Sequence, residues 1–238
     1  MTSRRTVVPR RPQGGGPPGG SGRLGTLATL LAVVAAVVLG GCGAPEYTYV
    51  TNSEDRTYLR VPASWHRIDE RELGEALGLD PTIPPEEQGL WMRGFDADPS
   101  PSPTHLFGAN AAAPAAFISV QQIPVSLRGG FSFDRLRDLF YPVSPTSRQQ
   151  LVGAGLYEDF TLVSDEVLTP GNGVRGVHVV FRYRQGNGPL QVVNQIAYLN
   201  DDASTLYAFF VRCSVECYEQ RKEEIESVVS SYTVRGNR

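Results

Sequence analysis

The chain has 238 residues, and its 25 acidic residues outnumber its 22 lysines and arginines, which gives a formal charge of −3 at pH 7. Five arginines and no acidic residue lie in residues 1–23, so the rest of the chain has 17 basic residues against 25 acidic ones, a formal charge of −8. Nucleic-acid binding is therefore not expected, because it needs a basic face that displaces counterions. About 196 residues follow Cys42, which is enough for one domain with its own core.

The N-terminal segment has the zones of an export signal. The arginine-rich residues 1–23 favour the cytoplasmic side, and an apolar run follows at residues 24–39. That run is long enough for the hydrophobic part of a signal peptide but marginal for a membrane-spanning helix. The sequence therefore predicts export, and one uncleaved transmembrane helix of the same topology stays open as the alternative.

The end of the apolar run indicates lipid attachment. Leu39, Gly40 and Gly41 directly precede Cys42, and small residues give a peptidase access to the backbone. This pattern resembles the lipobox of bacterial lipoproteins, which implies signal-peptidase recognition at Leu39, Gly40 and Gly41 and a diacylglycerol on Cys42. Residues 1–42 are then a signal peptide that ends in the lipobox cysteine. The protein is expected to be lipid-anchored on the extracytoplasmic side of the cell membrane.

The segment between Cys42 and the first predicted strand is short. Residues 43–56 are expected to form a tether, which at about 3.3 Å per residue reaches at most roughly 45 Å. Residues 58–61 alternate apolar and polar side chains, which predicts a strand at the start of a single globular domain over residues 57–238. We therefore expect the domain to stay close to the membrane surface.

Two short helices with clear ends are predicted next. Asp69 is expected to cap the first, with Glu72 placed as in a capping box, and Gly78 suits its C-terminal end. Ser132 is expected to cap the second, which stops before Pro142. The strands predicted in this part of the chain are residues 89–96 and 115–123, with a proline-rich excursion at 98–104 between them.

The rest of the domain alternates strand-like runs with turns rich in Gly and Asn. One turn, at residues 171–176, matches G-x-G-x-x-G, but a dinucleotide site needs this loop to open a helix, whereas the next residues alternate like a strand. A hairpin turn is therefore favoured. The predicted elements are strands at 160–168, 174–184, 190–199 and 205–212 and an amphipathic helix over about 215–231. This order predicts an α+β fold, a mainly antiparallel sheet covered by helices.

Two cysteines remain besides Cys42, namely Cys213 and Cys217. In an oxidising compartment a disulfide is the expected state of such a pair. A redox or metal pair is the alternative, but the spacing is C-x-x-x-C and no histidine lies within fifteen residues. A structural disulfide is therefore predicted, with a small stabilising effect because its loop is short.

A family resemblance rests on both ends of the domain. Residues 59–65, Leu-Arg-Val-Pro-Ala-Ser-Trp, are similar to the early signature of PsbP-like domains, a strand followed by Val-Pro and a tryptophan. The strand at 205–210, the helix that bears Tyr218 and the segment 230–232 resemble the end of the same family. Actinobacterial lipoproteins of the LpqN type share this arrangement. The resemblance implies an α/β/α sandwich around an antiparallel sheet, used for docking to partners, and brings no catalytic residues. The single lysine, Lys222, also suits a GC-rich actinobacterial genome.

Candidate chemistry is sparse in this sequence. His66, His105 and His178 are far apart, and none has metal-ligand spacing with another candidate ligand. Asp96 and Asp98 resemble a hard-cation pair, but a solvated loop is favoured because a third ligand is missing. No nucleophile motif is present, although a spatial Ser/His/Asp set can assemble from distant positions. We therefore expect no catalytic residue, metal or cofactor.

These observations predict a non-enzymatic cell-envelope lipoprotein that docks an unidentified envelope protein or component at the outer face of the membrane. The alternative is a carrier, or less readily a hydrolase, of a small apolar or lipid-like ligand held between sheet and helices. Its support is a set of aromatic residues that could line a pocket, although ordinary core packing is favoured for them. They are Phe181, Tyr183, Tyr207, Phe209 and Phe210.

Overall fold

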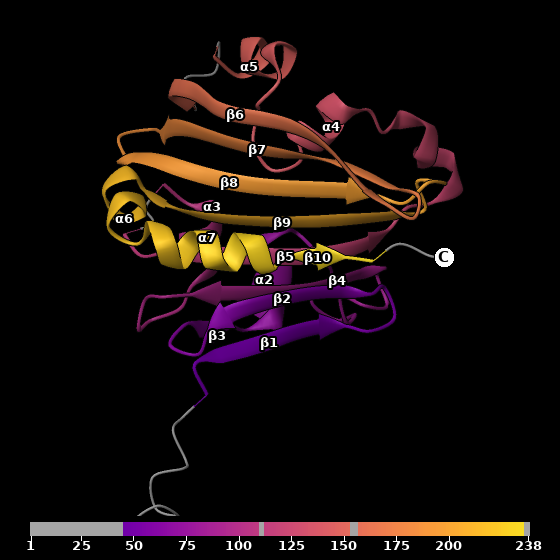
Figure 1. Ribbon diagram of the computed structural model, residues 1–238, viewed down its shortest axis with the longest axis horizontal. Coiled ribbons are helices and arrows are strands. Elements are labelled where there is room, and N and C mark those ends of the chain that lie inside the picture. Colours follow the sequence, from indigo (N-terminus) through magenta and orange to yellow (C-terminus); the bar gives the residue numbers. More distant parts are fainter. Residues whose placement is uncertain (1–44, 110–111, 153–156, 236–238) are drawn as a thin grey trace, which may run out of the picture. The chain divides into compact units, whose positions relative to one another are not determined.

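A seven-stranded sheet forms the centre of the protein in a computed structural model that describes residues 45–109, 112–152 and 157–235 (Figure 1). The strand order is β3-β4-β5-β9-β8-β7-β6, and every neighbouring pair is antiparallel. The α+β prediction is confirmed. The strands are β3 (His66–Ile68), β4 (Leu90–Asp96), β5 (Ala115–Gln122), β6 (Tyr157–Gly171), β7 (Val174–Gln185), β8 (Leu190–Leu199) and β9 (Thr205–Ser214).

A second, three-stranded sheet contains the first and the last described strands. Its order is β1 (Tyr47–Asn52), β2 (Thr57–Pro62) and β10 (Thr233–Val234), and both pairs are antiparallel. The tether predicted over residues 43–56 is therefore wrong for most of its length. The compact unit begins at Pro45, because β1 pairs six residues with β2 and turns Val50 into the core.

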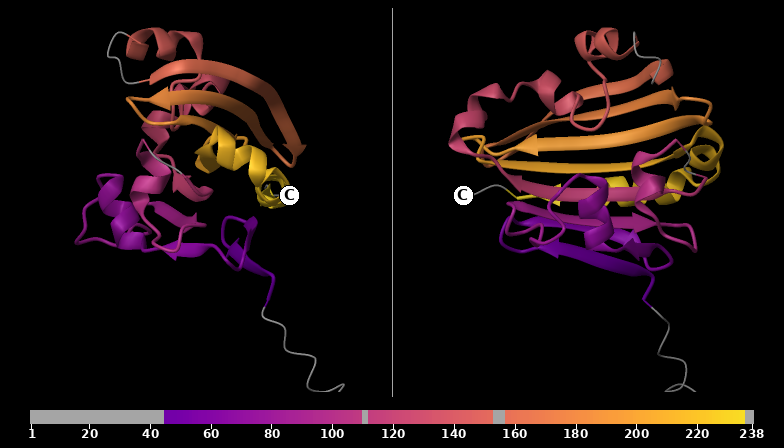
Figure 2. Two further views of the ribbon diagram at one scale, coloured as in Figure 1. Left: turned by 90° about the vertical axis from the view of Figure 1, so that its left-hand side faces the viewer. Right: turned by 180° about the vertical axis from the view of Figure 1, so that it is seen from behind.

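Helices cover both faces of the seven-stranded sheet (Figure 2). On one face, α2 and α3 place Leu73 and Leu106 in a core cluster with Phe117. On the other, α7 places Ile225 and Val228 against the alternate residues of β5. This is the expected α/β/α layering. The helices are α2 (Glu70–Ala76), α3 (Pro103–Phe107), η1 (Val125–Gly130), α4 (Phe133–Arg137), α5 (Pro145–Val152), α6 (Val215–Gln220) and α7 (Lys222–Ser231).

The predicted helix caps are in place. The Asp69 side chain accepts hydrogen bonds from the backbone N–H groups of Arg71 and Glu72, which have no partner inside the helix. Gly78 ends this helix with φ at +75°, a left-handed conformation that favours glycine. Ser132 likewise accepts from the backbone N–H of Arg135 at the start of α4.

Two helical segments differ from the predictions. The proline-rich excursion contains α3, because Ser102 accepts from the backbone N–H of Thr104 and Pro103 occupies the first turn, where its missing N–H costs nothing. The single helix predicted over 215–231 is two helices that meet at Arg221, whose φ of −117° is not helical. Among the described residues, no helix is both long and apolar enough to cross a membrane.

Candidate functional site

An open groove of about 740 Å³ lies between strands β6 to β8 and helices α6 and α7. It exists because the sheet curves, so that β6 and β7 extend beyond the helices that cover β9 (Figure 2). Its volume falls within the ~300–1,000 Å³ of small-ligand sites. The residues that line the groove include Val163, His178, Val180, Arg182, Val192, Asn194, Ile196, Tyr218, Glu219, Lys222, Glu226 and Val229.

The alternation of β7 separates the groove from the core. His178, Val180 and Arg182 line the groove, whereas the residues between them turn to the opposite face. There Phe181 and Tyr183 are 1% exposed and pack on Tyr141, with ring centroids 5.8 Å and 4.9 Å away. One strand therefore supplies both the floor of the groove and the centre of the aromatic core.

A short polar chain crosses the middle of the floor. Nε2 of His178 lies 2.7 Å from Oδ1 of Asn194, and Nδ2 of Asn194 donates to the Tyr218 hydroxyl at 3.3 Å. Asn194 is almost fully buried, so these partners satisfy an amide that would be costly to leave unpaired. The chain also joins helix α6 to strand β8, which fixes one wall of the groove.

Arg182 lies near these hydrogen-bonded residues and has no acceptor of its own in the part of the protein that the structure describes. Its Nε atom is buried and has no hydrogen-bond partner, and no ion pair to its guanidinium occurs within the described part of the chain. Its neighbours in the sheet register, Thr161 and Val192, are uncharged. On the rim, the exposed side chains of Lys222 and Glu226 pair with each other at 3.7 Å. The floor thus carries a half-buried cation.

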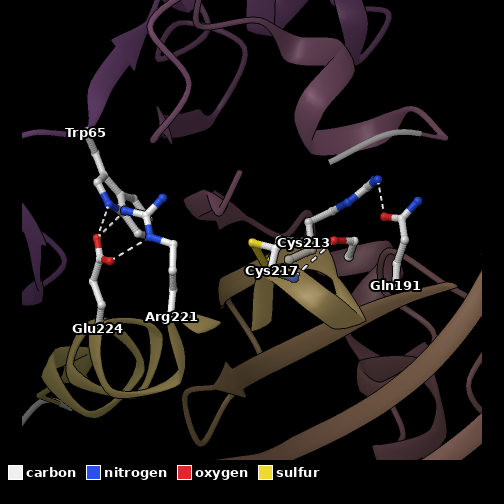
Figure 3. Close-up of a disulfide and its surroundings, with 8 residues drawn as sticks. Trp65, Gln191, Cys213, Cys217, Arg221 and Glu224 are labelled. Carbon is white, nitrogen blue, oxygen red and sulfur yellow. Dashed lines mark hydrogen bonds and ion pairs between the residues drawn. A yellow bond between two sulfur atoms is a disulfide. The ribbon is translucent and has the colours of Figure 1, made fainter. Parts of the chain in front are cut away.

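A disulfide and a group of hydrogen bonds hold helices α6 and α7 in place (Figure 3). A disulfide joins Cys213 at the end of β9 to Cys217 in α6, with Cα atoms 5.9 Å apart, which confirms the predicted pairing. Further along, Glu224 of α7 accepts from Nε1 of Trp65 at 2.6 Å and from both Nε and Nη2 of Arg221, at 2.8 and 2.7 Å. These links hold the junction of α6 and α7 against the sheet.

Of the three histidines considered as metal ligands, only His178 lines the groove. His66 lies exposed on β3, and His105 pairs through Nδ1 with Oδ2 of the buried Asp96 at 2.6 Å. Asp96 also accepts from the backbone N–H groups of Asp98 and Ser102, so it orders the proline-rich loop. No cluster of three or more potential metal ligands occurs in the ranges that the structure describes.

The five aromatic residues that could have lined a pocket are core residues, so the favoured prediction of ordinary core packing is confirmed. Phe181, Tyr183 and Phe210 lie on the face opposite to the groove. Tyr207 and Phe209 lie in the core beneath the helices, where the Phe209 ring stacks on Tyr232 at 5.0 Å. The groove therefore uses other residues of the same strands.

The G-x-G-x-x-G segment is the predicted hairpin turn between β6 and β7. Gly171, Asn172 and Gly173 have positive φ angles of 97°, 53° and 75°, which the turn requires. Gly176 lies within β7, where the Ala197 carbonyl occupies the place that a Cβ would take.

Sequence reasoning missed Arg182, Asn194 and Tyr218 as site residues. A signal for the first was present, because two polar residues in the middle of β7, His178 and Arg182, share the side of the strand that lacks aromatic residues. A buried sheet face is normally apolar, so two polar positions on one side indicate a face that is only partly covered. The position of α6, which brings Tyr218 to Asn194, has no comparable local signal.

No family model and no curated protein matches the chain. Solved structures do resemble it. Cyanobacterial PsbP from Synechocystis sp. PCC 6803 gives a TM-score of 0.44 at 16% identity, over 82% of this chain and 96% of that one. LpqN of Mycobacterium tuberculosis, described as involved in cell envelope biogenesis, gives 0.40 at 14% identity over 84% and 96%. The Ran-binding protein Mog1p of Saccharomyces cerevisiae gives 0.41 at 8% identity over 80% and 96%. Solved structures similar to this chain thus include PsbP and LpqN, the two named in the sequence resemblance.

Proposed function

We propose that the protein is a non-enzymatic binding protein of the cell envelope, anchored at the outer face of the cytoplasmic membrane through Cys42, and that the groove is its binding surface. The observation that carries the proposal is the groove itself. Apolar walls, a hydrogen-bonded polar centre and a cation that has no acceptor among the described residues meet there. A concave site that combines apolar walls with a few placed polar groups is typical of ligand recognition.

The anchor rests on Leu39 to Cys42, which lie outside the described residues. Two acyl chains on one cysteine give stable membrane attachment, at about 0.8 kcal/mol per buried methylene. Five Cα–Cα steps separate Cys42 from Tyr47 at the start of β1, so the chain between them reaches at most roughly 18 Å. This length favours a binding protein that works close to the bilayer.

The groove supports binding more than catalysis. A serine nucleophile needs an adjacent base that holds its proton. Within the described chain, His178 is hydrogen-bonded to Asn194, and the Ser230 hydroxyl at the rim donates to the Ser227 carbonyl. The same groove also suits the alternative of a carrier for a lipid-like ligand, because it lies between sheet and helices and its walls include valines and isoleucine.

Photo-crosslinking in intact cells tests the groove as the binding surface. A photoreactive amino acid replaces Lys222 at the rim, and in a matched control it replaces Glu223, the exposed next residue of α7, which does not line the groove. We expect a discrete adduct from position 222 that is absent from position 223. Equal labelling from both positions would remove the groove from the proposal.

Metabolic labelling with a fatty acid tests the anchor. The native chain should incorporate the label, and Cys42→Ala should lose it and move to the soluble fraction or persist uncleaved. The matched control is Cys217→Ser, which removes a cysteine from the folded domain and should keep the label. A native product that retains residues upstream of Cys42 and carries no acyl chain would contradict the anchor.

A further inference from the structure

We propose that the groove binds an amphiphile with a single anionic head group, whose head contacts Arg182 and whose apolar body lies along Val180, Ile196 and Val229. This inference rests on the groove being the binding surface, and it adds the chemical class of the ligand. Carboxylates and phosphate monoesters with an alkyl chain share this chemistry.

Arg182 differs from the other buried and half-buried arginines of the described chain. Every other arginine that is buried or half-buried in the described chain donates from its side chain to at least one acceptor, whereas Arg182 has no acceptor there. A guanidinium presents five N–H donors and stays charged, so partial burial without an acceptor is costly. The arginines that do have acceptors are Arg60, Arg93, Arg128, Arg137, Arg148, Arg184, Arg212 and Arg221.

The cost is recovered when an anion enters the groove. A charge-assisted pair between guanidinium and carboxylate or phosphate is stronger away from bulk water, and the planar guanidinium suits two parallel hydrogen bonds. Arg182 is fixed in place for this role, since its strand pairs on both sides with β6 and β8 and its Nε atom is already buried. An acceptor from the ligand would supply the partner that the described part of the chain does not supply.

The apolar walls of the groove indicate that the ligand has an apolar part beyond its head group. Val180, Val192 and Ile196 form the floor on either side of the polar chain, and Val229 closes the helical side. Val163 on the edge strand β6 is 54% exposed at the opposite side of the groove. An alkyl chain would bury the exposed parts of Val163 and Val180, which a small inorganic anion would leave in contact with water.

The rim limits the charge of the head group. Glu219 and Glu226 lie at the edge of the groove, and Lys222 is already paired with Glu226. The domain beyond Cys42 is acidic overall, so a polyanion would meet repulsion on approach. A ligand with one anionic group, matched to the one groove guanidinium that has no acceptor among the described residues, is therefore complementary.

Fluorescence titration with dansyl-undecanoate and its uncharged methyl ester tests the inference. The protein used is residues 43–238, which contain the whole compact unit Pro45–Arg238. We expect the acid to bind about tenfold more tightly than the ester, the gain typical of a hydrogen-bonded charged group. In Arg182→Gln this preference should disappear, and Arg182→Lys should restore part of it.

The matched control is Arg175→Gln, an exposed arginine of the same strand that does not line the groove. It should keep the preference for the acid. Circular dichroism and thermal unfolding of each variant establish that the fold is retained. An acid and an ester that bind equally, or an Arg182→Gln variant that retains the preference, would overturn the inference.

Displacement of the probe distinguishes the sources of the head group. Laurate and dodecyl phosphate are both competitors of the proposed class, and the tighter one identifies the head group. Inorganic phosphate should displace nothing, and displacement by it would contradict the amphiphile. If crosslinks form at position 222 while Arg182 has no influence on affinity, the groove remains the binding surface and the ligand class proposed here is wrong.

Discussion

The two faces of the seven-stranded sheet differ in how completely helices cover them, although the same strands form both. On the face covered by α2 to α4, Phe210 is fully buried and its ring lies 4.7 Å from that of Phe140 and 5.7 Å from that of Phe117. On the face covered by α6 and α7, the outer strands are left uncovered and carry His178 and Arg182. The side of β7 that carries Phe181 and Tyr183 is therefore fully packed, and the side that carries His178 and Arg182 is free for binding.

The largest expected effect comes from opening the packed face. Phe210→Ala should lower the free energy of unfolding by about 3–5 kcal/mol, because it removes a buried ring and leaves a cavity among other rings. Val180→Ala, on the half-buried groove face of β7, should cost about 1 kcal/mol or less. Denaturant unfolding of both variants measures the difference. Similar losses would mean that the two faces are packed alike.

A second test compares two arginines on opposite faces. Arg212 is fully buried and donates to the Leu106 carbonyl at 2.7 Å, to the Tyr141 hydroxyl at 3.1 Å and to the Gly108 carbonyl. Arg212→Met leaves these acceptors unpaired and should cost about 3 kcal/mol of unfolding free energy. Arg182→Gln should change it by less than about 0.5 kcal/mol, because Arg182 has no acceptor within the described chain to lose. A large loss on replacing Arg182 would assign it a structural role.

The disulfide is expected to have an intermediate effect. Its sequence separation is 4, so closing this short loop contributes about 2 kcal/mol in the chain-entropy description. The double variant Cys213→Ser, Cys217→Ser should lose that amount in denaturant unfolding. It should also weaken the groove wall, because Tyr218 follows Cys217 and its hydroxyl accepts from Asn194. Unchanged stability under reducing conditions would show that the hydrogen bonds alone hold α6.

The smallest effect concerns Tyr232 at alkaline pH. Burial raises the pKa of its phenol well above 10, and the nearby Tyr198 and Tyr207 raise it further. The unfolded chain ionises near pH 10 while the folded chain keeps the phenol neutral, so its contribution is complete below pH 10 and is lost as the pH rises above it. The loss should reach about 1.4 kcal/mol at pH 11, one unit above the pKa of the unfolded chain. Tyr232→Phe should remove this part of the pH dependence in urea unfolding, and an unchanged slope would contradict it.

The sequence predicted those parts of the fold whose signals are local. Asp69, Ser132 and the turn at Gly171 specify caps and a hairpin through side-chain oxygens and backbone angles that neighbouring residues decide. Strand β1 was missed because its exposed Tyr49 and polar neighbours give it no core pattern until β2 lies beside it. The Ser102-Pro103 pair offered a usable signal for α3 that the proline-rich composition obscured.

The groove could not be predicted in the same way. It depends on how far the sheet curves past α7 and on which strands the helices leave uncovered, and both are properties of long-range packing. The state of Arg182 is likewise visible only from the absence of acceptors around it in the described chain. Sequence alone identifies a polar residue in a strand, but not whether the fold provides its partner.

The three-stranded sheet affects the order in which the protein can fold. Thr233 and Val234 pair with Tyr58 and Thr57, so strand β2, near the beginning of the domain, is completed only by residues that lie 175 and 177 positions later in the chain. During synthesis, β2 keeps one unpaired edge until those residues have been added. A chain cut short before Thr233 would expose that edge permanently, and unpaired edges recruit other strands.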